Sequence, residues 1–157
     1  MDAHEAISAD PQTGSSPGKR FTIDEANRAI PLIRRITEDV VACYRRFQEV
    51  DSRHRELTDR GEHDDRIIPL EDVEKIGDER DRIRARLLEL RDGLSEIGVE
   101  LKDWEKGLVD FPGRRGERDV CLCWKLGEKS VAYWHEIRAG YGGRKAIDKE
   151  FEEACER

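Results

Sequence analysis

The residues best suited to chemistry gather in one short stretch of the chain, residues 119–137. It holds two of the three tryptophans, two of the four cysteines and a histidine, His135, that stands among aromatic residues. Thiol, imidazole and carboxylate groups are the side chains that bind transition metals and that act as nucleophiles or general bases. A functional site is therefore expected first in this stretch.

Side-chain alternation along β-strands decides which of these residues can cooperate. The stretch is typical of two strands joined at Gly127 and Glu128, where a loop of two or four residues would bring the apolar residues of both strands to one face. This register predicts that His135 lies on the core face with Trp124, away from the cysteines. The outward face then carries our candidate ligand or metal site, which consists of Asp110, Cys121, Cys123, Trp134 and Glu136.

A metal on that face needs three or four ligands that converge at about 2.0–2.3 Å. Cys121 and Cys123 form a C-x-C pair, unlike the C-x-x-C pair of zinc knuckles, so thiols that merely fill a half-buried face are the competing interpretation. A nucleophile–base pair of Cys123 and His135 would require a loop of odd length or a bulge. We therefore expect no catalytic residue, and the sequence does not identify a metal or any other cofactor.

A glycine-rich segment, residues 138–146, follows this stretch. Its backbone amides could bind an anion, and the candidate anion-binding residues are Gly140, Gly142, Gly143 and Arg144. The segment lacks the spacing of a Walker or dinucleotide loop, so a plain flexible loop is the alternative. Binding of nucleic acid through the nearby aromatic rings is disfavoured, because the chain has a net charge of −7.

Two long amphipathic helices must position these strands. Apolar residues recur every three or four positions over residues 22–60 and again over residues 70–101, with a short polar linker between. This pattern predicts an antiparallel, coiled-coil-like hairpin. Thr22 and Glu25 form a capping box at its start, and Pro31 predicts a kink in the first helix.

The hairpin contains a charged residue, Arg80, within its apolar seam and also a second apolar edge, and both need other residues to pair with or pack against. Folding about the linker brings Asp51 within reach of Arg80, a pairing that would fix the register of the seam. It also places His54 near Gly77, where the imidazole should fill the seam. The first helix also has a second apolar edge, made of Ala29, Ile30, Val41 and Tyr44. This edge should pack against the C-terminal segment or against a second copy of the hairpin.

Beyond the hairpin, residues 107–137 contain three short runs rich in β-branched and aromatic residues. They predict a three-stranded antiparallel meander. The expected fold class is α+β, mainly α, with the helical hairpin followed by this meander. Residues 20–148 should form one domain, flanked by a disordered tail at residues 1–19 and by a charged tail or frayed helix at residues 149–157.

Composition narrows the class of protein. Charged residues make up 41% of the chain and hydrophobic residues 36%, which suits a charged hairpin better than a large globule. Residues 102–145 carry ten Lys/Arg against seven Asp/Glu, so this part is about +3 and the remainder about −10. No secretory signal, membrane-spanning run or disulfide framework is visible. We expect a cytoplasmic protein that does not bind membranes.

Six motifs in a fixed order resemble a known family. They are residues 20–32 (RFTIDEANRAIPL), 98–103 (GVELKD), 107–112 (GLVDFP), 122–128 (LCWKLGE), 133–135 (YWH) and 140–144 (GYGGR). Together they resemble the bacterial family named domain of unknown function 2203, over about residues 20–148. The resemblance implies a small cytoplasmic bacterial protein with a helical hairpin and a C-terminal β segment, and it implies no activity. The matching positions, which carry no assigned role, are Asp110, Cys123, Trp124, Trp134, His135 and Arg144.

The leading functional hypothesis is a non-enzymatic binding or scaffold module that self-associates through its hairpin, with a second copy or another protein as partner. It rests on the regular double seam and on the second apolar edge. The alternative is a metal- or thiol-dependent site, enzymatic or not, on the outward face of the meander.

Overall fold

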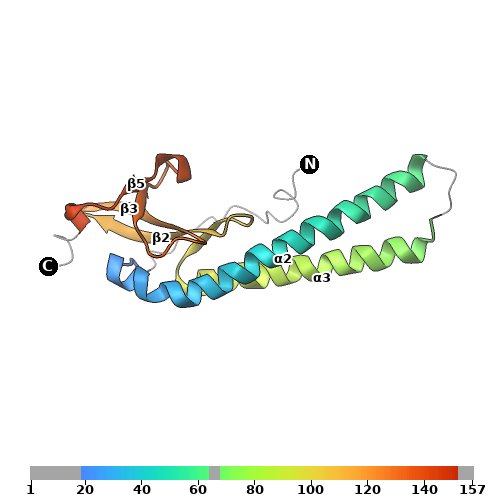
Figure 1. Cartoon of the computed structure of the whole chain (residues 1–157), viewed down its shortest axis with the longest axis horizontal. Helices are drawn as coiled ribbons and strands as arrows, with labels where there is room; N and C mark the ends of the chain where they lie inside the picture. Colours follow the sequence, from blue (N-terminus) through green and yellow to red (C-terminus); the bar gives the residue numbers. More distant parts are fainter. Residues whose placement is uncertain (1–18, 64–67, 152–157) are drawn as a thin grey trace.

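The computed structural model of the chain describes residues 19–63 and 68–151, and for residues 61–63 only the backbone. A helical hairpin extends from a small β-sheet, which packs against one end of it (Figure 1). Apart from Lys19, the expected tail at residues 1–19 lies outside the described residues. The expected C-terminal tail is described only as far as Phe151, where residues 149–151 are helical.

Helices α2 (Ile23–His63) and α3 (Leu70–Ile97) form the hairpin. The predicted capping box is confirmed, because the Glu25 amide donates to Thr22 Oγ1 at 3.1 Å and the Thr22 amide donates to Glu25 Oε1 at 3.3 Å. Pro31 lies inside α2 without breaking it. The second helix was predicted to reach residue 101, which is wrong. It stops at Ile97 because Gly98 takes a left-handed φ of 101° and its amide bonds back to Ser95.

The predicted approach of Asp51 to Arg80 in the hairpin is confirmed, and His54 joins it. Arg80 Nη1 lies 4.0 Å from Asp51 Oδ1 and 3.1 Å from His54 Nδ1. Gly77 provides the room for the imidazole, since a Cβ at that position would stand 3.3 Å from His54 Nε2. Asp51 also accepts a hydrogen bond from Arg55 Nε at 3.0 Å. These polar groups therefore satisfy one another inside an otherwise apolar seam.

The β segment is a five-stranded antiparallel sheet with the strands in chain order. Its strands are β1 (Glu100–Asp103), β2 (Leu108–Arg115), β3 (Arg118–Lys125), β4 (Tyr133–Glu136) and β5 (Lys145–Ala146). The predicted meander of three strands is an undercount. The first half of β1 had been assigned to the second helix and β5 to the glycine-rich loop, because edge strands of four and two residues are too short to show an alternating pattern.

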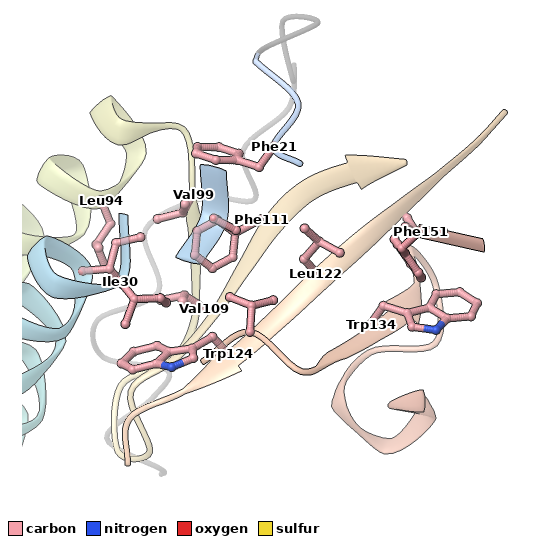
Figure 2. Packing of buried hydrophobic residues seen from close by; sticks show 14 residues of the cluster. Phe21, Ile30, Leu94, Val99, Val109, Phe111, Leu122, Trp124, Trp134 and Phe151 are labelled. Carbon is pink, nitrogen blue, oxygen red and sulfur yellow. The ribbon is translucent and has the colours of Figure 1, made fainter. Parts of the chain in front are cut away.

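The sheet packs one face against the first turns of α2 and the last turns of α3. Figure 2 shows this core, where Ile30 and Leu94 from the helices meet Val109, Phe111 and Trp124 from the sheet. The other buried members labelled there are Phe21, Val99, Leu122, Trp134 and Phe151. The predicted core face of β2 and β3 is confirmed by the burial of these residues.

The second apolar edge of α2 packs against this C-terminal segment, as one of the two alternatives predicted. Ile30 joins the core of the sheet, and Tyr44 stacks on Trp104 with 6.5 Å between the ring centroids. Gly107 brings the turn between β1 and β2 against the helix. A Cβ there would lie 3.2 Å from Val41 Cγ2, and the φ of Gly107 is +66°. In the described residues this edge is covered within one copy of the chain.

Candidate functional site

The pairing of β3 with β4 decides which residues share the outward face of the sheet. Cys121 lies opposite His135 and Cys123 opposite Tyr133. An odd number of residues therefore separates the two members of each pair, whereas the predicted loop of two or four residues requires an even number. The predicted register is therefore wrong. His135 lies on the outward face with both cysteines, whereas Trp134 and Glu136 lie opposite Leu122 and Val120 on the other face.

The long connection between β3 and β4 explains this register. It is anchored to α2 by a hydrogen bond that a tight two-residue turn would not make, because Val131 N donates to Asn27 Oδ1 at 2.7 Å. Trp134 then supplies the apolar side chain that β4 directs toward the core, so the odd register keeps the buried face apolar.

Two members of the predicted site thus lie elsewhere. The Trp134 ring packs against Phe151, with the Arg115 guanidinium 4.9 Å from its centroid. The Glu136 carboxylate accepts a hydrogen bond from Arg118 at 2.7 Å. Trp124, which the family motifs also contain, is fully buried in the core and donates from Nε1 to Glu128 O at 3.1 Å. None of these three side chains belongs to the outward face.

The outward face brings together a carboxylate, a thiol and an imidazole from three adjacent strands. Asp110 on β2, Cys123 on β3 and His135 on β4 each offer a ligand atom, and these atoms lie within 4.8 Å of one another. We call these three residues the DCH cluster. All three side chains are buried, with exposed fractions of 4%, 0% and 2%. Cys121 is on the same face and half-buried, outside the cluster.

The register shows why His135 and Asp110 meet. Asp110 stands opposite Cys123, and His135 stands opposite Cys121, two residues along the same strand. The side chains of the two flanking strands therefore converge above β3. His135 Nε2 lies 3.0 Å from Asp110 Oδ2. Sequence reasoning placed His135 on the wrong face, and only the length of the β3–β4 connection as folded could have corrected it.

The hydrogen bonds of His135 define how many protons the cluster holds. Its Nδ1 lies 2.7 Å from the carbonyl oxygen of Glu136. A carbonyl oxygen only accepts, so Nδ1 carries a hydrogen. The contact between Nε2 and Asp110 then needs one more proton, carried by either partner. The Asp110–His135 pair has no net charge in either form, which suits a buried position.

The remaining polar atoms of the cluster are unusual. Asp110 Oδ1 is buried and makes no hydrogen bond of normal geometry within the described residues; the Cys123 thiol, a weak donor, is the group that interacts with this carboxylate. Burial raises the pKa of the Cys123 thiol to about 12, and the neighbouring Asp110 contributes to this rise. Cys123 is therefore a neutral thiol at neutral pH. An orphaned carboxylate oxygen next to a buried thiol is a costly arrangement unless something else binds there.

This geometry argues against nucleophilic catalysis by Cys123. Both ring nitrogens of His135 are already engaged, by Asp110 and by the Glu136 carbonyl. The imidazole thus has no free nitrogen with which to take the thiol proton. A raised pKa of Cys123 is also the reverse of what an activated cysteine needs.

The glycine-rich candidates for anion binding are largely engaged within the protein. They lie at and around the short 3-10 helix η1 (Tyr141–Gly143), where the Gly143 amide donates to Gly140 O at 3.0 Å and the Arg144 amide to Tyr141 O at 3.2 Å. The guanidinium of Arg144 donates to both carboxylate oxygens of Glu128, at 2.5 and 3.1 Å. Its charge is therefore already paired, and it also donates to Cys123 O at 3.3 Å.

The thiols of the outward face should react slowly with alkylating reagents. Burial raises the pKa of Cys121 to about 11 and that of Cys123 to about 12, so the reactive thiolate is scarce at pH 8. We expect iodoacetamide to label both residues at least ~100-fold more slowly than free cysteine, whose pKa is about 8.5. Mass spectrometry of a Cys155→Ser variant measures this, since Cys155 lies outside the described residues. Labelling of the native protein as fast as that of the urea-unfolded protein would contradict the burial of these thiols.

The fold and the cluster define a class of protein: an α+β chain in which a helical hairpin carries a five-stranded antiparallel sheet with a buried thiol, imidazole and carboxylate. Within the described residues, no helix has the length and apolar character needed to cross a membrane. The chain belongs to the family described as "Uncharacterized conserved protein (DUF2203)", whose model matches residues 19–147. Comparison with the curated proteins and with the solved structures finds no match.

Proposed function

We propose that this protein binds a single Zn²⁺ ion through the DCH cluster, and that it is a binding module rather than an enzyme. The observation that carries the proposal is the convergence of three different ligand types, one of which has an orphaned oxygen, in a buried site. Thiolate, imidazole and carboxylate together suit zinc better than the harder cations Mg²⁺ and Ca²⁺.

The hydrogen bond of His135 supports this role. A metal-binding histidine commonly donates its second ring N–H to a carbonyl or carboxylate, which fixes the tautomer and the ring orientation. Nδ1 of His135 makes this bond to the Glu136 carbonyl and thereby directs Nε2 toward Asp110 and Cys123. The backbone of the same strand thus holds the imidazole ready to bind a metal.

The spacing of the three ligand atoms also supports zinc. Zinc–ligand distances of about 2.0–2.3 Å in a tetrahedron place the ligand atoms roughly 3.3–3.6 Å apart. Nε2 and Oδ2 are 3.0 Å apart, and all three atoms lie within 4.8 Å. Small side-chain rotations on three hydrogen-bonded strands are therefore sufficient to close the site.

Charge balance favours the same ion. A zinc ion would replace the Cys123 thiol proton and the proton that Asp110 and His135 share. Two positive charges would leave and two would enter, so the buried site would keep its net charge. The ion would join β2, β3 and β4 through one side chain each, and a water or another small ligand would take the fourth position of the tetrahedron.

A cobalt titration tests this proposal, because Co²⁺ occupies zinc sites and gives thiolate charge-transfer absorption. We expect metal-free protein to take up one Co²⁺ per chain with such absorption, and Zn²⁺ to displace it. Cys123→Ser should lose the thiolate absorption. Cys121→Ser is the matched control, since it removes a thiol from the same face of the same strand and should retain it.

The proposal fails if the native protein shows no thiolate–cobalt absorption, or if the two cysteine variants behave alike. Circular dichroism of both variants shows whether they are folded. Elemental analysis of untagged protein gives a second measurement, with about one zinc per chain expected.

Self-association through the hairpin, the other functional hypothesis, is a prediction that the described residues leave untested. The second apolar edge no longer supports this hypothesis, because its residues Ile30 and Tyr44 are buried within one copy of the chain. Sedimentation velocity over a concentration series decides it. A cytoplasmic location is likewise a proposal, and it is supported by three free cysteines among the described residues, Cys43, Cys121 and Cys123.

A further inference from the structure

A second feature of the sheet lies at the end where β3 finishes and η1 crosses it. Three cations surround the ring of Tyr141: Arg144 at 4.9 Å, Lys106 at 5.5 Å and Lys125 at 5.8 Å from its centroid. Tyr141 is 40% exposed. Arg144 also lies 4.3 Å from the centroid of Tyr133, which is 37% exposed. We call Tyr133, Tyr141, Lys106 and Lys125 the tyrosine shelf.

The backbone brings the two lysines to the same end of the sheet. Lys106 lies in the turn between β1 and β2, and Lys125 is the last residue of β3. Lys125 pairs with Leu108, and the hydrogen bond from Leu126 N to Gly107 O closes this end. The convergence of both ammonium groups on Tyr141 therefore follows from strand pairing as well as from side-chain rotamers.

Arg144 differs from Lys106 and Lys125 in whether a carboxylate neutralises its charge. Arg144 is paired with both carboxylate oxygens of Glu128. Among the described ion pairs, by contrast, no carboxylate lies within 4.0 Å of the Lys106 or Lys125 ammonium group, whereas Lys102 is paired with Glu100 at 2.8 Å. Two unpaired positive charges thus meet at one ring, in a chain whose net charge is −7. Such a local reversal of charge attracts an anion.

We propose that the tyrosine shelf binds a small nucleoside phosphate. The phosphate draws the Lys106 and Lys125 ammonium groups off the Tyr141 ring, and the base takes their place on that ring. Lysine ammonium groups bind phosphate oxygens through charge-assisted hydrogen bonds. Bases stack on exposed aromatic rings without needing specific pairing. Arg144, held by Glu128, keeps both rings in place before the ligand arrives, which lowers the cost of binding.

The surroundings of the rings fit a small ligand. A Cβ at Gly140 or at Gly142, on either side of Tyr141, would meet no atom within 4 Å, so the backbone next to Tyr141 faces open space. A long nucleic acid would instead have to pass surfaces that carry the net negative charge of the remaining chain. The shelf adjoins the DCH cluster, because Tyr133 lies opposite Cys123 and Arg144 donates to Cys123 O at 3.3 Å. No member of the shelf is a ligand of the cluster, so its occupation does not depend on a metal.

Isothermal titration of the full chain in EDTA with AMP, adenosine and inorganic phosphate tests this proposal. We expect AMP to bind more tightly than either of its parts, and added salt to weaken AMP but not adenosine. Lys106→Gln and Lys125→Gln should each weaken AMP roughly tenfold, and Tyr141→Leu should weaken AMP while leaving inorganic phosphate unchanged. Lys149→Gln removes the same charge from an exposed position off the shelf, and it should bind AMP as the native protein does.

Each alternative outcome has a clear meaning. Absence of AMP binding, or equal binding of AMP and adenosine, overturns the proposal. A short single-stranded oligonucleotide is also titrated, as a competing class of ligand. If it binds more tightly per molecule than AMP, the ligand is a nucleic-acid strand, and the proposal of a small ligand is overturned. Because EDTA removes any metal, a negative result here leaves the cobalt titration of the DCH cluster unaffected.

Discussion

Replacing Asp110 with alanine should lower the free energy of unfolding of the metal-free protein by about 3–5 kcal/mol. The carboxylate and the His135 ring are both almost fully buried, with 3.0 Å between Oδ2 and Nε2. Removal of one partner leaves a buried imidazole that can no longer share its second proton. Urea denaturation in the presence of EDTA measures the change.

A double-mutant cycle separates this pairing from simple loss of volume. His135→Ala alone should also be costly, and the double variant should be less destabilised than the sum of the two single variants by about 2 kcal/mol or more, because no orphaned partner is left. The exposed pair of Arg118 and Glu136 is the matched control, with 2.7 Å between its atoms on the same sheet. Glu136→Ala should cost less than about 1 kcal/mol. If the losses in free energy of unfolding of the two single variants simply add in the double variant, Asp110 and His135 do not act as a pair.

Trp124→Ala should cost about 3–5 kcal/mol, the usual range for a fully buried tryptophan or phenylalanine. Its ring is fully buried where the sheet meets the helices (Figure 2), and Nε1 donates to Glu128 O at 3.1 Å. Trp124→Phe keeps most of the volume and removes the hydrogen bond, so about 1–2 kcal/mol is expected.

The control for Trp124 is Leu32→Ala, which shortens an apolar side chain that is 52% exposed on α2. This change should stay within about 0.5 kcal/mol of the native protein. Denaturant unfolding followed by circular dichroism compares the variants, because the fluorescence of the tryptophan variants differs. A Trp124→Ala protein as stable as the Leu32→Ala protein would mean that the sheet holds to the hairpin without this ring.

Local sequence patterns were sufficient to predict the hairpin and about half of the sheet. The apolar period of 3.6 residues predicted both helices, and the capping box of Thr22 and Glu25 stands as expected. Alternation along β2 and β3 correctly assigned Val109, Phe111 and Trp124 to the core. These features depend on residues a few positions apart, so the sequence carries the information directly.

The two edge strands were missed for a physical reason. Strand β5 has two residues and β1 has four, and both owe their existence to backbone hydrogen bonds with a neighbouring strand. Their own side chains contribute little pattern. Their place in the sheet is a consequence of the fold around them.

The grouping of the candidate site was the largest difference between the sequence and the structure. The sequence by itself determined which chemical groups are present, and the family resemblance named Asp110, Cys123 and His135 without linking them. Only the tertiary structure decided that they meet. A connection anchored to Asn27 on α2 shifts β4 by one residue, and a shift of one residue turns every side chain to the opposite face. Contacts between distant parts of the chain, rather than local preference, thus place the histidine beside the thiol.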